Sequence, residues 1–170
     1  DTPIGAIVLS GATKHTYAEG HLAEKSALLV DTGGDDEYRV AVGSGPSDVP
    51  VGIAVDLGGR DVYAYAEVAD PQDLPTRLAS DAAGRSNSLG SFGQTNSRVG
   101  RQGSGVRGIV ALFDLGSEGD EYRSLTLSQG SAALGVGALF DAGGDDDYAA
   151  EAMCQGAALW GVGVLVDRGG

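Results

Sequence analysis

The stretch DAGGDDDYAAEAMCQG, residues 141–156, decides the fold of this chain because it recurs along the sequence. It places four aspartates within seven residues, next to two glycines. The apolar run VGALF, residues 136–140, comes directly before it and is typical of a buried strand. So much negative charge at the end of a buried strand requires a structural or chemical reason, because a buried charge must be paired or neutralised.

The recurrence has three fixed offsets. Apolar runs end in an aspartate at Asp31, Asp56, Asp114, Asp141 and Asp167. Eleven residues before these aspartates lie Gly20, Gly45, Gly103, Gly130 and Gly156. Seven or eight residues after the first four lie Tyr38, Tyr63, Tyr122 and Tyr148. A degenerate first copy has Ser10 in place of the aspartate and Tyr17 seven residues later. The agreement predicts a repeat of 25–27 residues.

One interval is longer than the others. Asp56 and Asp114 are separated by one repeat plus an insertion, which we place at residues 70–102. The insertion is rich in Pro, Ser, Asn and Gly, as surface loops are, and residues 74–83 are a candidate for a short helix. We therefore expect repeat coils in 1–69, an inserted loop in 70–102 and further coils in 103–170. The chain ends on DRGG, the start of another motif, so we expect the array to continue beyond it.

Each repeat reads as a short apolar strand, a Gly-rich acidic turn and a second strand that begins with tyrosine. A propeller blade needs about 40 residues, whereas a unit of this length suits one coil of a solenoid. We therefore predict an all-β protein: a repeat β-solenoid of the parallel β-helix or β-roll type, with 25–27-residue coils and one long inserted loop. A β-sandwich of repeated hairpins is the alternative.

The first strand of each repeat is apolar at every position. In the copy that ends at Asp141, residues one, three and five before the aspartate are Phe140, Ala138 and Val136. This period-two face predicts the core. The opposite face carries Leu139 and a glycine, so we expect a second layer to cover it.

Stacked coils would place equivalent aspartates above one another, about 4.8 Å apart. Two carboxylates at that distance repel by roughly 3–4 kcal/mol at an effective dielectric of about 20. Calcium is one remedy, since it binds six to eight oxygens. The alternative is turn capping, in which each carboxylate accepts hydrogen bonds from backbone N–H groups. The candidate metal ligands are Asp31, Asp35, Asp36, Asp56, Asp61, Asp114, Asp120, Asp141, Asp145 and Asp146.

The turn sequences GGDDEY, GGRDVY, GSEGDEY and GGDDDY resemble the Gly–Asp turns of RTX, or haemolysin-type, calcium-binding β-roll repeats. The pattern of that family is G-G-x-G-x-D followed by an apolar residue, and residues 116–120 (GSEGD) come nearest to it. RTX repeats are nonapeptides, whereas the period here is 25–27 residues, so the resemblance covers the turn motif only. It implies a calcium-binding solenoid of a secreted bacterial protein.

Composition narrows the classes of function. The net charge of −13 and pI of about 4.2 argue against nucleic acid and anionic membranes as partners. No apolar run reaches the ~18 residues of a membrane span, so we expect no membrane insertion. The chain has two histidines and one cysteine, and residues that recur in every repeat are architectural. We therefore expect no enzyme.

These observations favour a structural, assembly or adhesive solenoid segment of a bacterial extracellular or cell-surface protein, stabilised by calcium. Its expected partner is a second copy or a larger protein assembly, because open solenoid ends and apolar sheet faces favour association. The alternative is a non-catalytic binding module that uses residues 70–102 to hold a protein or a glycan.

Overall fold

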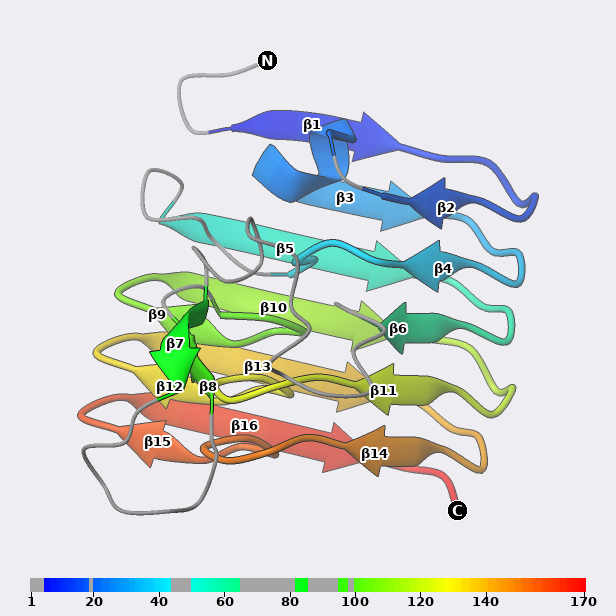
Figure 1. Cartoon of the computed structure of the whole chain (residues 1–170). Coiled ribbons are helices and arrows are strands. Elements are labelled where there is room, and N and C mark those ends of the chain that lie inside the picture. Colours follow the sequence, from blue (N-terminus) through cyan, green and yellow to red (C-terminus); the bar gives the residue numbers. More distant parts are fainter. Residues whose placement is uncertain (1–4, 19, 44–49, 65–81, 86–94, 98–99) are drawn as a thin grey trace.

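The computed structural model describes residues 5–18, 20–43, 50–64, 82–85, 95–97 and 100–170. The described chain is all-β apart from one 3₁₀ helix, η1 (Leu22–Lys25), and all but two of its strands lie side by side in parallel sheets (Figure 1). This arrangement is compatible with a β-solenoid. No helix in these residues is long and apolar enough to cross a membrane.

The largest sheet has six strands, all parallel. In spatial order they are β1 (Ala6–Leu9), β3 (Ser26–Asp31), β5 (Val51–Asp56), β10 (Ile109–Asp114), β13 (Val136–Asp141) and β16 (Val162–Asp167). A second parallel sheet contains the tyrosines, in β2 (Thr16–Tyr17), β4 (Glu37–Tyr38), β6 (Val62–Ala64), β11 (Glu121–Arg123) and β14 (Asp147–Ala149). A third contains β9 (Gly105–Val106), β12 (Ala132–Ala133) and β15 (Ala158–Leu159).

The register of these sheets stacks equivalent residues. In the six-stranded sheet, Asp31 pairs with Asp56, Asp56 with Asp114, and so on through Asp141 to Asp167. The tyrosines of the second sheet pair in the same way from Tyr17 to Tyr148. We call one strand of the six-stranded sheet, together with the tyrosine-bearing strand that follows it in sequence, a layer. Repeated hairpins would pair adjacent strands antiparallel, and among the described strands only β7 (Ala82–Arg85) and β8 (Thr95–Ser97) do so.

The prediction of the core face was wrong. In the inner strands, the buried side chains are those two and four residues before the aspartate, such as Leu112 and Val110 in β10, together with the aspartate itself. Ile109, on the predicted core face, is 61 % exposed. Alternate residues of a strand share a face, so the interior aspartate and the buried leucine point the same way. Because both faces are apolar, hydrophobic periodicity could not distinguish them.

The interior is tight, which explains its small residues. A Cβ on Gly137 would lie 1.9 Å from the carbonyl oxygen of Ser131. In the acidic turns, a Cβ on Gly59 would lie 1.7 Å from the carbonyl oxygen of Gly34 in the preceding layer. Gly59 also has φ +135, a conformation that favours glycine. The Gly-rich turns therefore allow successive layers to approach closely.

The insertion differs in part from expectation. Ala82 and Ala83, the last two residues of the predicted helix, lie in strand β7, and the remainder of residues 74–83 lies outside the described residues. Most of the predicted loop at 70–102, and with it the hypothesis of a binding module, also lies outside them. Arg101 forms a parallel bridge with Ser128, and Gln102 has the same left-handed conformation as Gln129.

Candidate metal site: two rows of buried aspartates

The aspartates that end the strands of the six-stranded sheet form the first row: Asp31, Asp56, Asp114, Asp141 and Asp167. The first four are at most 1 % exposed. In each turn, carboxylate Oδ1 accepts the backbone N–H two residues further on, as Asp114 does from Gly116 at 2.9 Å. The same bond is made in the other turns to Gly33, Gly58, Gly143 and Gly169. These side chains therefore cap their own turns.

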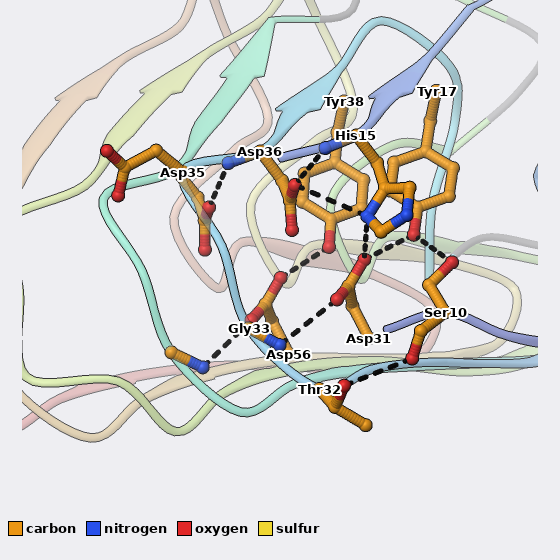
Figure 2. Close-up of polar contacts among 12 residues, drawn as sticks. Ser10, His15, Tyr17, Asp31, Thr32, Gly33, Asp35, Asp36, Tyr38 and Asp56 are labelled. Atoms are coloured by element: carbon orange, nitrogen blue, oxygen red, sulfur yellow. Dashed lines mark hydrogen bonds and ion pairs between the residues drawn. The ribbon is translucent and has the colours of Figure 1, made fainter. Parts of the chain in front are cut away.

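A second donor reaches the first row from the tyrosine column. The hydroxyl of Tyr63 donates to Asp114 Oδ2 at 2.7 Å, and that of Tyr122 donates to Asp141 Oδ2 at 2.6 Å. Tyr17 and Tyr38 donate likewise to Asp31 and Asp56 (Figure 2). Each first-row carboxylate from Asp31 to Asp141 thus has a donor for both oxygens.

The tyrosine rings form a continuous stack through the core. Neighbouring ring centroids are 4.6–4.8 Å apart and the ring planes differ by 1–7° from Tyr17 through Tyr148. This spacing follows the separation of paired strands in a sheet. The stack holds the hydroxyls of Tyr17, Tyr38, Tyr63 and Tyr122 against a first-row aspartate of the following layer. Burial, followed for Tyr38 by the charge of Asp56, raises the tyrosine pKa, so the hydroxyls remain donors.

The second row contains Asp36, Asp61, Asp120 and Asp146. One oxygen of each accepts a backbone N–H from the second-row residue of the preceding layer. The N–H of Asp36 donates to Asp61 Oδ1 at 2.7 Å, that of Asp61 to Asp120 at 2.6 Å, and that of Asp120 to Asp146 at 2.7 Å. The other oxygen, Oδ2, is buried in all four aspartates without a hydrogen-bond partner. The second row therefore differs from the first in lacking a donor for half of each carboxylate.

The two rows meet in compact groups. Each group contains the first-row and second-row aspartates of one layer and the second-row residue of the preceding layer, with ligand atoms within 4.8 Å of one another. Three groups are purely carboxylate: Asp36 with Asp56 and Asp61, Asp61 with Asp114 and Asp120, and Asp120 with Asp141 and Asp146. A fourth group has His15 in place of one aspartate, beside Asp31 and Asp36. These acidic groups can hold a metal ion.

Burial and mutual repulsion perturb the second row strongly. Burial, followed by the charges of Asp56, Asp114 and Asp120, raises the pKa of Asp61 to about 9, although the N–H of Asp36 opposes the rise. Burial and the charge of Asp114 likewise raise the pKa of Asp120 to about 8. Both shifts favour the protonated carboxyl when no cation is present. The groups can be neutralised in two ways, by a proton or by a metal ion.

Eight of the ten predicted ligands come together in these groups. The exceptions are Asp35 and Asp145, which are exposed and belong to none of the groups found among the described residues. Asp35 Oδ1 accepts the N–H of Arg60 at 3.1 Å. In the two acidic pairs 35–36 and 145–146, adjacent residues point to opposite sides of the chain, so only the second residue of each pair faces the interior.

His15 was not among the predicted ligands. It lies five residues after Ser10, as Asp36 lies five residues after Asp31, so it occupies the second-row position of the first layer. The same offset of five residues, counted from Ser10, could have identified His15 as a candidate ligand from the sequence. The tyrosine hydroxyls that donate to the first row were also not predicted from the sequence.

Comparison with protein-family models, with curated proteins and with solved structures returned no match for this chain.

Proposed function

We propose that this chain is a structural scaffold: a β-solenoid segment with coils of 25–27 residues, whose successive coils are held together by calcium ions bound between the two aspartate rows. The observation that carries the proposal is the second row. The Oδ2 atoms of Asp36, Asp61 and Asp120 are buried without a donor, in groups of three carboxylates. A buried carboxylate without a partner destabilises the fold unless a counter-charge is present.

Calcium suits these groups in ligand type, spacing and charge. Each carboxylate offers one ligand atom to its group, and backbone carbonyls or water would supply the rest of the six to eight oxygens that Ca²⁺ takes. Ligands bound at 2.3–2.6 Å lie no more than about 5 Å from one another, and the ligand atoms here lie within 4.8 Å. Each coil adds one first-row and one second-row carboxylate, so one divalent ion per coil balances their charge.

The same features support an extracellular or cell-surface location in a bacterium, with assembly or adhesion as the biological role. Calcium sites in extracellular modules fill at about 10⁻⁴–10⁻³ M. The turns resemble RTX repeats, which bind calcium outside the cell. The outer face of the six-stranded sheet exposes Ile109, Val162 and other apolar side chains, which favours self-association or a larger assembly. The groups repeat from coil to coil, and we therefore propose no catalytic role for them.

Thermal unfolding tests the proposal. The chain is melted in EDTA, in millimolar Ca²⁺ and in millimolar Mg²⁺, because a ligand that binds only the folded state raises Tm. We expect a large rise with Ca²⁺ and a smaller one with Mg²⁺, which prefers octahedral sites that keep several water ligands. A well-folded sample whose Tm is the same in EDTA and in Ca²⁺ would refute the calcium proposal.

Two matched variants sharpen the experiment. Asp61→Asn removes one buried charge shared by two groups, so it should raise Tm in EDTA at pH 9 and reduce the calcium-induced rise. Asp35→Asn removes an exposed charge outside the groups and should change neither quantity by more than about 2 °C. Equal behaviour of the two variants would show that the second row is not the calcium site.

A further inference from the structure

The first layer has no aspartate in either row and holds other polar residues at those positions. In this layer Ser10 occupies the first-row position and His15 the second-row position. The Tyr17 hydroxyl bonds to Ser10 Oγ at 2.6 Å and also to Asp31 of the next layer. The backbone N–H of His15 donates to Asp36 Oδ1, as second-row residues do elsewhere. The group of His15, Asp31 and Asp36 therefore has the geometry of the other groups with an imidazole in place of one carboxylate (Figure 2).

The distances in this group fit a metal ion. His15 Nδ1 lies 3.5 Å from Asp31 Oδ2 and 3.7 Å from Asp36 Oδ1. Tetrahedral ligands at bond lengths of about 2.0–2.2 Å lie about 3.3–3.6 Å apart. Small movements of these side chains would bring three protein ligands around one ion.

The group also contains buried polar atoms that lack partners. The side chain of Asp36 is 0 % exposed, and its Oδ2 has no hydrogen-bond partner. His15 Nδ1 is likewise buried without one, although the ring as a whole is 33 % exposed. A buried nitrogen that faces two buried carboxylates can be satisfied by its own proton or by a shared cation.

The surroundings hold the three side chains in place. The Tyr17 hydroxyl donates to Asp31 Oδ2, and the backbone N–H of His15 holds Asp36 Oδ1. Such contacts orient metal ligands and strengthen binding. The His15 and Tyr17 rings lie 6.0 Å apart, so the tyrosine stack also limits the position of the imidazole.

The ligand type separates this group from the others. Carboxylates alone suit Ca²⁺ and Mg²⁺, whereas an imidazole suits Zn²⁺, Cu²⁺ and Ni²⁺. A neutral imidazole and two carboxylates balance one divalent ion. Three protein ligands with a fourth position open to water is also a known zinc arrangement.

We propose that His15, Asp31 and Asp36 bind one divalent transition-metal ion of the Zn²⁺ class. This site is the group nearest the first layer. It differs in metal preference from the all-carboxylate groups. It shares Asp36 with the neighbouring group of Asp56 and Asp61, but its metal preference comes from the imidazole and requires no calcium in that group.

Cobalt is the probe for this site, because Co²⁺ replaces Zn²⁺ and absorbs visible light. The folded chain is titrated with Co²⁺ in excess Ca²⁺, while the visible bands and the imidazole proton NMR signals are followed; Zn²⁺ is then added in competition. We expect one equivalent of Co²⁺ to bind, one histidine to show paramagnetically shifted signals, and Zn²⁺ to remove both effects.

Variants assign the ligands. His15→Asn should weaken Co²⁺ binding at least about 100-fold, since even loss of a group that hydrogen-bonds to a metal ligand costs about 10–100-fold. His15→Asp, which creates one more all-carboxylate group, should lose the visible bands in the same way. Two control variants should leave binding unchanged: His21→Asn, which alters the imidazole that caps η1, and Cys154→Ser, which removes the free thiol. A melt in Ca²⁺ checks that each variant is folded.

The proposal fails if folded wild-type chain binds no Co²⁺, or if His15→Asn and His15→Asp bind it as tightly as wild type. In the first case, His15, Asp31 and Asp36 form no metal site, and their role is confined to the contacts between the first two layers. In the second case, the ion lies in an all-carboxylate group. A chain that binds Co²⁺ through His15 but shows no calcium-dependent Tm would keep this site and refute the scaffold calcium. A chain whose Tm rises with calcium but that binds no Co²⁺ through His15 would keep the scaffold calcium and refute this site.

Discussion

The two aspartate rows lie in the same turns and are both buried, yet their surroundings differ. Asp114 in the first row has a backbone N–H for one oxygen and the Tyr63 hydroxyl for the other. Asp120 in the second row has the backbone N–H of Asp61 for one oxygen, and its Oδ2 has no partner. The first row therefore has the donors expected of turn caps, and the second row has the deficit that a metal ion or a proton would fill.

This difference changes how the repeat is interpreted. Turn capping and metal binding are alternatives when the aspartates are taken as one set. In the structure, turn capping describes the first row. The donor deficit is confined to the second row, and there the competition is between a cation and a proton. Substitutions in each row, and outside both, show whether the rows respond independently.

The largest effect is expected from a first-row truncation. Asp114→Ala leaves the Gly116 N–H and the Tyr63 hydroxyl without an acceptor in the interior. Each unsatisfied buried donor costs about 1–3 kcal/mol, so we expect a loss of about 3 kcal/mol in the free energy of unfolding after relief of charge repulsion. Urea unfolding in EDTA and in Ca²⁺ measures it. A loss present only in Ca²⁺ would mean that Asp114 acts through a metal ion rather than as a cap.

The second effect is on pH dependence in EDTA. The pKa of Asp36 is raised to about 6, that of Asp120 to about 8 and that of Asp61 to about 9, chiefly by burial. The folded state then binds more protons than the unfolded state, whose aspartates titrate near 3.9. The stabilisation by these protons is complete below pH 4 and is lost as pH rises through about 9.

We therefore expect Tm in EDTA to fall by at least about 5 °C between pH 5 and pH 9, and millimolar Ca²⁺ to offset most of that fall. Differential scanning calorimetry at a series of pH values measures both. The comparison is made against Asp61→Asn, which should flatten the EDTA curve. A Tm that rises with pH in EDTA would contradict the assignment of protons to the second row.

A smaller effect is expected when a first-row donor is lost without loss of packing. Tyr122→Phe keeps the ring between Tyr63 and Tyr148 but removes the hydrogen bond to Asp141. We expect a loss of about 1–2 kcal/mol, and a larger loss of about 3–5 kcal/mol for Tyr122→Ala, which also removes the buried ring. Chemical denaturation of the pair separates the two contributions. Equal losses would show that the hydroxyl contributes nothing to the first row.

The smallest effect is expected outside both rows. Asp145→Asn changes an exposed side chain next to Asp146, and we expect a change within about 0.5 kcal/mol. The calcium-induced shift in Tm should also stay as in wild type. A reduced shift would place Asp145 among the ligands, as the sequence had suggested.

Much of this architecture was predictable from spacing alone. The offsets of glycine, aspartate and tyrosine correctly indicated parallel strands in register, because equivalent residues of adjacent layers must pair. The sequence could also have shown that Asp36, rather than Asp35, is the candidate ligand. In two of the other repeats the position of Asp35 holds Arg60 or Gly119, whereas the position of Asp36 holds an aspartate in every repeat that contains it except the degenerate first copy, where it holds His15.

Other features depend on three-dimensional packing. The strand faces could not be told apart, because Leu112 and Phe113 are both apolar and only the inward direction of Asp114 decides between them. The donor deficit of the second row depends on which backbone N–H groups reach the carboxylates. These N–H groups come from the neighbouring layer, so the sequence of a single repeat does not show which carboxylate oxygens lack a donor.

The most direct test of the second-row account is a terbium luminescence titration. Tb³⁺ occupies calcium sites and emits when nearby tyrosines are excited, and the tyrosine stack bonds directly to the first row. The account predicts sensitised emission that Ca²⁺ displaces, reduced in Asp61→Asn and unchanged in Asp35→Asn. Folded chain that gives no sensitised emission, or emission that Asp61→Asn leaves intact, would contradict a cation between the rows and leave the proton as the counter-charge.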